Sequence, residues 1–218
     1  PFCDRFANRN HQIPIHSSVS RYQETLEWLY AQLPVFQHTG GQQSSYKLDL
    51  KKTEAFMEAL GHPYRHFPAF HVAGTNGKGS TSHMLASCLQ AGGYRVGLYT
   101  SPHLVSYTER IRIQGQAISE EAVVEFVDQW KPLLVDLRLS FFEMSVGMAY
   151  QTFAEAQVDV AVIEVGMGGR LDSTNIIEPI VTGITTIDLD HQAFLGEHRA
   201  LIAREKAGIF KPGIPAII

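Results

Sequence analysis

The clearest chemical signal in the sequence is a glycine-rich turn with a lysine, AGTNGKGST at residues 73–81. The apolar run AFHVA at 69–73 precedes it, and a helical pattern follows. Glycines let a backbone curve around an anion, and the free N–H groups at a helix start bind phosphate oxygens. The ammonium of Lys78 adds a point charge for the terminal phosphates of a nucleotide. The residues predicted to contact this nucleotide are Thr75, Asn76, Gly77, Lys78, Gly79 and Ser80.

The turn departs in two ways from the strict nucleotide-loop pattern G-x-x-x-x-G-K-[ST]. Val72 stands where the first glycine would be, and Gly79 rather than Ser or Thr follows Lys78. The hydroxyl that binds magnesium is therefore expected from Ser80, from Thr81 or from elsewhere in the chain. Two alternatives stay open at this point: a turn without a ligand, and a nucleotide site that performs no chemistry.

A second candidate site surrounds Glu164, which interrupts the apolar run VDVAVIEVG at 158–166. Such a β-branched run is typical of a strand buried on both faces. An ionised carboxylate is costly to bury alone, so we expect a cation beside it. Because ligands gather at the carboxyl ends of parallel strands, a magnesium ion bridging the phosphates of ATP is the natural partner. A core ion pair between Glu164 and Arg170 is the alternative.

Two further residues follow predicted strands and belong to the same edge of the sheet. His191 follows IVTGITTID at 180–188, and Ser101 follows RVGLYT at 95–100. An imidazole can complete a metal site, although magnesium usually prefers oxygen, and the Ser101 hydroxyl could replace the one that the loop lacks. Taken alone, His191 could equally be a loop histidine, Ser101 a turn residue before proline, and Lys206 a solvated lysine on a charged helix.

The elements that position these residues alternate along the chain. Helical spacing predicts helices over 20–33, 49–60, 80–91, 119–137, 142–156 and 197–208. Apolar, β-branched runs predict strands over 69–73, 95–100, 158–166, 180–188 and 214–218, with a hairpin over 109–119. The helix over 80–91 is expected to have Met84, Leu85, Cys88 and Leu89 on one face. This order indicates a three-layer α/β fold with a mostly parallel sheet, of the P-loop-type mononucleotide-binding class.

Composition excludes several classes of protein. The 218 residues are 44% hydrophobic and 18% charged, which excludes disorder and a coiled coil. A net charge of −4 gives no electrostatic footprint for nucleic acid, and no apolar run reaches the ~20 residues of a membrane span. Cys3 and Cys88 cannot form a disulfide framework, so we expect a reducing cytoplasm. Residues 1–19 are predicted to be a leader or flexible extension, and residues 20–218 an ATP-binding domain of a longer protein.

Five motifs together resemble a known enzyme family. GTNGKGS, TSPHLVSYTERIRI, VIEVGMGGRLDSTN, LDHQAFLG and REKAGIFKPG occur in this order in the folylpolyglutamate synthase/dihydrofolate synthase family of Mur-type ATP-dependent amide ligases. The resemblance runs from about Ser20 to the end of the chain. It implies an N-terminal ATPase domain without the smaller C-terminal α/β domain of the family.

The resemblance also implies roles for individual residues. Ser101, Glu164 and His191 match the ligands of two magnesium ions, and Lys206 matches a lysine whose carbamate helps to hold the second ion. The catalytic residues that it implies are Lys78, Glu164, His191 and Lys206. The segments that match contacts to the pteroate or folate substrate are Lys47, Leu48, Asp49 and Leu50; Ser140, Phe141, Phe142 and Glu143; and Leu171, Asp172 and Ser173.

The function implied by the resemblance is ATP-dependent ligation of L-glutamate to dihydropteroate or to (tetrahydro)folate polyglutamate, through an acyl phosphate. The expected partners are these small molecules, ATP and magnesium, with neither nucleic acid nor membrane, and the protein is expected to be a monomer. An ATP- and magnesium-binding domain without independent activity stays open as the alternative for this chain. A cell-wall Mur ligase is disfavoured by GGRLDSTN at 168–175.

Overall fold

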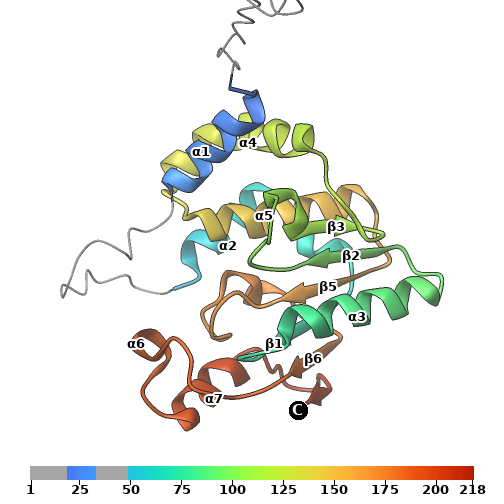
Figure 1. The fold of residues 1–218 in the computed structure, drawn as a ribbon, viewed down its shortest axis with the longest axis vertical. Helices are drawn as coiled ribbons and strands as arrows, with labels where there is room; N and C mark the ends of the chain where they lie inside the picture. Colours follow the sequence, from blue (N-terminus) through green and yellow to red (C-terminus); the bar gives the residue numbers. More distant parts are fainter. Residues whose placement is uncertain (1–18, 33–48) are drawn as a thin grey trace, which may run out of the picture.

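The computed structural model describes residues 19–32 and 49–218, which form an α/β domain around a mixed sheet (Figure 1). Within these residues the sheet has seven strands in the order β4-β3-β2-β5-β1-β6-β7. The parallel strands are β1 (Ala69–Ala73), β2 (Val96–Tyr99), β5 (Val160–Glu164), β6 (Val181–Ile184) and β7 (Ala216–Ile217). An antiparallel hairpin of β3 (Ile111–Ile113) and β4 (Gln116–Ala117) completes one edge. The predicted mostly parallel sheet is confirmed.

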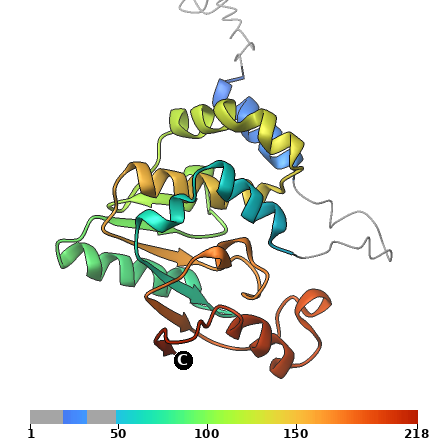
Figure 2. The same ribbon diagram turned by 180° about the vertical axis from the view of Figure 1, so that it is seen from behind.

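Helices lie on both faces of the sheet, as Figures 1 and 2 show. The longer ones are α1 (Arg21–Ala31), α2 (Lys51–Ala59), α3 (Lys78–Ala91), α4 (Glu120–Asp136), α5 (Phe141–Glu155) and α7 (Arg199–Ala207). The shorter ones are α6 (Gln192–Leu195) and the 3-10 helices η1 (Pro63–His66), η2 (Tyr107–Arg110) and η3 (Ser173–Ile176). Helix α3 packs on β1, β2 and β5, whereas α1 packs on α4 and α2 on α5.

Strand β5 shows why the sequence requires three layers. Val160 and Val162 pack with the α3 side of the sheet, while Ala161 and Ile163 join the larger core beneath α5. Alternate side chains of a strand point to opposite faces, so a continuously apolar strand needs a helical layer on each side. The prediction that this run is buried on both faces is confirmed, and its last residue, Glu164, is buried with it.

Local signals fix where several elements begin. The Ser119 hydroxyl accepts a hydrogen bond from the N–H of Ala122 and caps α4, as predicted. The Ser20 hydroxyl caps α1 in the same way. The turn between β3 and β4 places both Gln114 and Gly115 at positive φ, which is typical of a tight two-residue hairpin.

Two details of α3 differ from the sequence prediction. The helix begins at Lys78 rather than at residue 80, so the lysine of the phosphate loop is its first residue. The expected apolar face is only half correct: Leu85 and Leu89 pack against the core, but Met84 is 62% exposed and Cys88 is also exposed. The buried residues of α3 are Ser82 and Ala86, which are four positions apart and therefore lie on the same face of the helix.

No helix in the described part of the chain is both long and apolar enough to cross a membrane.

Packing between β2 and α5 predicts a stability effect at Gly97. A Cβ at this position would lie 2.8 Å from Cδ1 and 2.9 Å from Cγ of the buried Phe153 ring. We expect Gly97→Ala to lower the free energy of unfolding by about 1–3 kcal/mol through overpacking. Urea unfolding followed by circular dichroism measures the change. Gly183→Ala in β6 is the matched control, because its Cβ would meet nothing within 4 Å. Equal effects of the two substitutions would contradict the packing argument.

Candidate functional site

The site begins with the turn between β1 and α3. Gly74 has a φ of +149°, and a Cβ there would lie only 1.9 Å from Oγ1 of Thr185. Gly77, at a φ of +82°, is the N-cap of α3. A side chain at Gly74 would collide with the segment after β6, so only glycine lets the two loops approach this closely.

The segment after β6 holds the phosphate loop through two threonines. The N–H of Thr75 donates to the Thr186 carbonyl at 2.8 Å, and the N–H of Asn76 donates to the Thr186 hydroxyl at 3.0 Å. The Thr185 hydroxyl donates to the Asn76 carbonyl at 2.7 Å. Since an α-helix leaves its first N–H groups without intrahelical acceptors, the donors available for phosphate begin at Gly77. Sequence reasoning missed both threonines, although they stand in the quoted run TTID.

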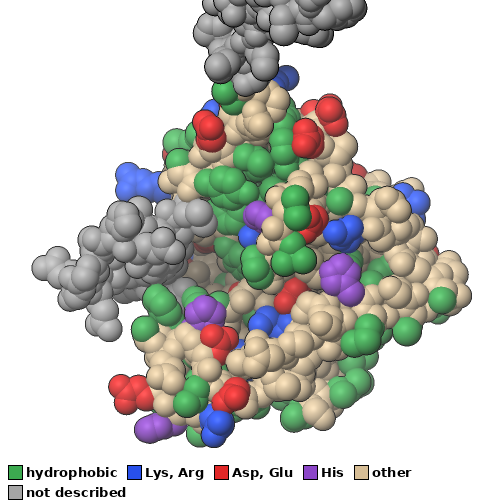
Figure 3. All heavy atoms as spheres, in the orientation of Figure 1, with side chains coloured by type: hydrophobic (Ala, Val, Ile, Leu, Met, Phe, Trp, Pro, Cys, Tyr) green, Lys and Arg blue, Asp and Glu red, His purple; other side chains and the backbone are tan. Residues whose placement is uncertain are grey.

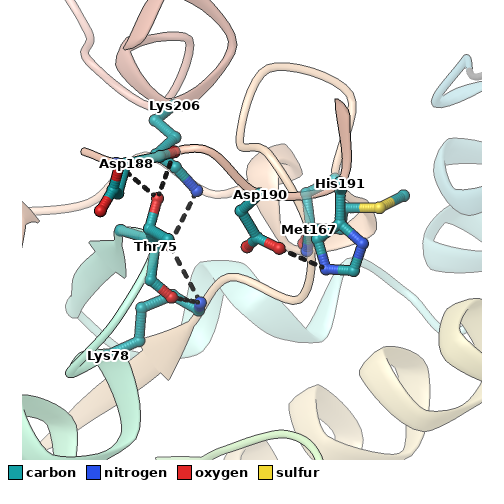
Figure 4. Close-up of polar contacts among 9 residues, drawn as sticks. Thr75, Lys78, Met167, Asp188, Asp190, His191 and Lys206 are labelled. Atoms are coloured by element: carbon teal, nitrogen blue, oxygen red, sulfur yellow. Dashed lines mark hydrogen bonds and ion pairs between the residues drawn. The ribbon is translucent and has the colours of Figure 1, made fainter. Parts of the chain in front are cut away.

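Two lysines meet at the carbonyl of Gly74 (Figure 4). Lys78 Nζ donates to this oxygen at 2.9 Å and to the Thr75 carbonyl at 3.1 Å. Lys206 Nζ, from α7, donates to the same Gly74 oxygen at 2.8 Å. Lys206 is 2% exposed, and burial, aided by the positive charge of Lys78, lowers its pKa. The alternative of a solvated lysine is therefore wrong, and α7 contributes a buried amine to the phosphate loop.

Glu164 ends β5 beside the start of α3. Its side chain is 3% exposed, and its Oε2 accepts a hydrogen bond from the N–H of Ser101 at 3.1 Å. A Cβ at Gly79 would lie 3.6 Å from the same oxygen, which places the carboxylate against the first turn of α3. Burial raises the pKa of Glu164, while the Ser101 N–H and the charge of Lys78 oppose that rise. Arg170 pairs with Glu205 at 2.9 Å, so the alternative core pair with Glu164 is wrong.

The predicted metal ligands are only partly brought together. The N–H of Ser101 donates to the Glu164 carboxylate, and the Lys206 amine donates to the Gly74 carbonyl in the phosphate loop. His191 is the half-exposed N-cap of α6, and its Nε2 lies 3.5 Å from Oδ1 of Asp190 (Figure 4). Among the described residues, no group of three or more His, Cys, Asp or Glu side chains is arranged to hold a metal ion. An ion between Ser101 and Glu164 would therefore need oxygens from outside such a cluster.

The predicted acceptor segment at 140–143 begins α5. The Ser140 hydroxyl accepts from the N–H of Glu143 at 3.3 Å, and a Glu143 oxygen accepts from the N–H of Ser140 at 2.7 Å. These two residues therefore form a capping box that fixes the helix start. Phe141 is 4% exposed in the core, whereas Phe142 is only partly buried. Phe142 is the member of this segment best placed to contact a ligand.

Asp172, in the third predicted segment, is held by a buried hydrogen-bond chain. Its Oδ1 accepts from the Thr174 hydroxyl at 2.5 Å and from the Thr174 N–H at 3.0 Å, while Oδ2 accepts from the Met167 N–H at 2.8 Å. Because the Thr174 hydroxyl donates to Asp172, it accepts from His71, whose Nε2 lies 2.9 Å away on β1. The chain fixes the protonated nitrogen of His71 as Nε2 and leaves its Nδ1 buried without a partner in the described structure.

The second and third predicted segments converge at Gly166. A Cβ there would lie 2.3 Å from Cζ of Phe142 and 3.1 Å from Oδ2 of Asp172. Leu171 and Ser173 flank Asp172 and are partly exposed. A glycine immediately after β5 and Val165 therefore lets the α5 start and the 171–173 segment meet next to Glu164.

Only Asp49 and Leu50 of the first predicted segment belong to the described residues. Lys47 and Leu48 fall outside the described residues. Asp49 is exposed and accepts from the N–H of Lys51 at 3.1 Å. Leu50 lines a groove of about 450 Å³ with Arg170 and other residues, none of which belongs to the 140–143 or 171–173 segments.

Comparison with known proteins shows where this domain belongs. The Mur ligase middle domain family matches residues 72–215, which include the phosphate loop, Glu164 and Lys206. The chain belongs to this family.

Relatives of this Mur ligase middle domain carry consistent names. The dihydrofolate synthase/folylpolyglutamate synthase of Escherichia coli is 50% identical over 149 residues, which are 68% of this chain and 35% of the relative. The protein of the same name from Bacillus subtilis is 41% identical over 203 residues, 90% of this chain and 45% of the relative. The structure of E. coli FolC in complex with DHPP and ADP has a TM-score of 0.75 at 41% identity, covering 88% of this chain and 45% of that one. The chain spans less than half the length of these relatives.

The buried chain from His71 to Asp172 predicts a pH effect on stability. Burial, with a smaller contribution from Lys211, lowers the pKa of His71 to about 3. The unfolded chain binds a proton near the ordinary value of about 6.5, so the stability that neutral His71 contributes is present above that pH and is lost as the pH falls towards 3. From about pH 7 to about pH 5, the wild-type domain should lose about 2 kcal/mol more unfolding free energy than His71→Gln, which retains a donor for Thr174.

Urea unfolding at a series of pH values measures this difference. His66→Gln serves as the control, because His66 is exposed and should follow the wild-type curve. Parallel pH curves for the wild type and His71→Gln would contradict a neutral buried imidazole.

Proposed function

We propose that this Mur ligase middle domain is the ATPase part of a ligase that adds L-glutamate to dihydropteroate or to a folate polyglutamate. The observation that carries the proposal is the position of Glu164. A buried carboxylate touches the start of the phosphate-loop helix and the segment after β2, at the carboxyl ends of three parallel strands. Relatives named dihydrofolate synthase/folylpolyglutamate synthase, and a related structure holding DHPP and ADP, support the substrate class.

The chain's residues fit the binding of ATP with magnesium. The first turn of α3 presents N–H donors, and Lys78 supplies a positive charge for the terminal phosphates. The carboxylate of Glu164 and the hydroxyl of Ser101 are oxygen donors of the kind that magnesium prefers. Magnesium, when bound, neutralises charge on the phosphates and on the leaving group. His191, the other proposed magnesium ligand, lies against Asp190 in this structure.

The reaction proceeds in two transfers. The acceptor carboxylate attacks the γ-phosphorus of ATP, the bond to the bridging oxygen breaks, and an acyl phosphate and ADP form. The amine of L-glutamate then attacks the acyl carbon, loses a proton and expels phosphate. The chain's own contribution to the first step is in-line positioning and charge neutralisation. Phe142 and Asp172, which converge at Gly166 beside Glu164, are the proposed acceptor contacts.

Lys206 fits the proposed carbamate. Only a neutral amine attacks carbon dioxide, and burial together with Lys78 shifts Lys206 towards that form. The nitrogen–carbon bond forms as one C=O π bond of carbon dioxide opens and a proton leaves the nitrogen, which turns the neutral amine into an anion. That anion would lie beside Lys78 and the Gly74 carbonyl, where a positive partner is already present.

A second candidate function is nucleotide binding without ligation by this chain alone. The chain covers 45% or less of the relatives' length, and the amine must bind somewhere for ligation to occur. A purified 218-residue chain that binds Mg-ATP and forms no glutamyl product favours this candidate for the domain by itself.

We further propose a monomer that works in the reducing cytoplasm, consistent with the free Cys88.

Substitution of the charged groups tests the proposed ligase. In the full-length protein, Lys78→Ala and Glu164→Ala should each lower glutamate incorporation into dihydropteroate and tetrahydrofolate by about 10²–10³-fold or more, because each removes one electrostatic group from the transition state. Lys131→Ala and Glu125→Ala, at exposed positions on α4, are the matched controls. Near-wild-type turnover of either site variant would contradict the assignment, and the ratio of the two wild-type activities gives the acceptor preference.

Isotope-labelled bicarbonate tests the carbamate on Lys206. We expect a carbamate carbon signal in the NMR spectrum of the wild-type protein at neutral pH, because its amine is buried with a lowered pKa. Lys206→Met should lose the signal, and Lys52→Met, at an exposed position, should retain it. A wild-type spectrum without the signal at saturating bicarbonate would show that Lys206 remains an amine.

A further inference from the structure

Arg110 is a buried cation that forms no direct ion pair in the described part of the chain. Its side chain, at the end of η2, is 7% exposed, and the ion pairs formed by the described residues all involve other side chains. Of the residues outside the described part, only Asp4 is acidic. A desolvated charge without a directly paired counter-charge is costly, so a cation kept in this environment is suited to an anionic ligand.

The packing around Arg110 orders its guanidinium without neutralising it. Nε donates to Nδ1 of His103 at 2.8 Å, and Cζ lies 5.0 Å from the ring centre of Phe141 and 5.9 Å from that of Tyr107. Aromatic faces offset part of the cost of a buried cation but leave its charge in place.

Arg110 lies between the proposed acceptor segment and the proposed magnesium ligands. Phe141, beneath the guanidinium, belongs to the 140–143 segment. On the other side, the N–H of Thr100 donates to the Arg110 carbonyl at 3.0 Å, and the next residue is Ser101, which donates to Glu164. Glu164 accepts from Ser101 and forms no direct ion pair with Arg110 among the described contacts, although the charge of Arg110 is near enough to lower the pKa of Glu164.

A buried hydroxyl adjoins the same cation. Tyr99 is fully buried, and Arg110 is the side chain that its OH adjoins; this OH has no other hydrogen-bond partner within the described structure. Its ring centre lies 6.2 Å from that of Phe142, and the charge of Arg110 opposes the rise that burial causes in its pKa. A guanidinium and a hydroxyl side by side, both out of water, match a ligand that carries a negative oxygen.

We propose that Arg110 binds the acceptor carboxylate that becomes phosphorylated, with the Tyr99 hydroxyl as a second donor. This inference rests on the proposed function, which supplies that carboxylate. The planar fork of a guanidinium matches the two oxygens of a carboxylate, and a lysine could not do the same. A positive charge there offsets the repulsion between the carboxylate and the γ-phosphate, and it can still hold the carbonyl oxygen of the acyl phosphate.

A comparison of two ligands tests the role of Arg110. The full-length protein is titrated by fluorescence with dihydropteroate and with its carboxamide analogue, in which a neutral amide replaces the benzoate carboxylate. Arg110→Gln should weaken dihydropteroate binding by about 10- to 100-fold, the range for a charge-assisted hydrogen bond, and should change carboxamide binding by less than about 2-fold. Arg110→Lys, which retains the charge but not the fork, should show a smaller loss with the same selectivity.

Arg112→Gln is the matched control. Arg112 lies two residues further along the chain, on β3, and its Nη1 donates to the Gly115 carbonyl, so both ligands should bind as they do to the wild type. Equal weakening of both ligands, or no weakening, in Arg110→Gln or in Arg110→Lys would overturn the inference. Circular dichroism identifies a variant that has lost its fold. If either Arg110→Gln or Arg110→Lys is unfolded, the ligand selectivity of the folded one tests the inference. A wild-type protein that binds neither ligand would contradict the proposed function itself.

Discussion

The close approach of the β1–α3 turn to the segment after β6 is the constraint on which the site depends. Gly74 leaves no room for a side chain against Thr185, and the threonine pair 185–186 holds both sides of the loop. This contact turns the Gly74 carbonyl towards Lys78 and Lys206 at once. Without it, the amine from α7 would have no acceptor, and a buried lysine 132 positions away along the chain could not be accommodated.

The strand order places the rest of the chemistry around that contact. Strand β5 lies between β1 and β2, so Glu164 reaches the phosphate-loop helix on one side and the segment after β2 on the other. Ligands of open α/β sheets bind at such carboxyl ends of strands. The same register brings Phe142 and Asp172 to Gly166, only two residues after Glu164. Nucleotide and acceptor groups are thereby placed next to each other by sheet topology rather than by long side chains.

Much of this arrangement could be predicted from the sequence, because local patterns encode it. The apolar runs at β1 and β5 and the N-cap Ser119 follow from periodicity and hydrogen-bonding preference alone. The burial of Lys206 could not be read in the same way, since its neighbours Arg204 and Glu205 are charged and only the docking of α7 on Gly74 removes it from water. Hydrophobicity alone puts Met84 on the buried face of α3 with Leu85 and Leu89, whereas the structure places Met84 on the solvent side. The sequence contains no local signal for Arg110, because its importance depends on the lack of a direct ion pair among the described residues.

The buried chain from His71 through Thr174 to Asp172 has a mechanical consequence. It joins the strand that precedes the phosphate loop to the loop that adjoins Phe142 through hydrogen bonds of 2.9 and 2.5 Å. These hydrogen bonds oppose independent movement of β1 and the 171–174 loop. They thereby help to keep a constant distance between a nucleotide at the phosphate loop and an acceptor at Phe142. Substitutions at His71, Thr174 or Asp172 would disturb β1 as well as the acceptor loop. Changes in acceptor preference are therefore expected at neighbouring positions that take no part in these hydrogen bonds, such as Leu171 and Ser173.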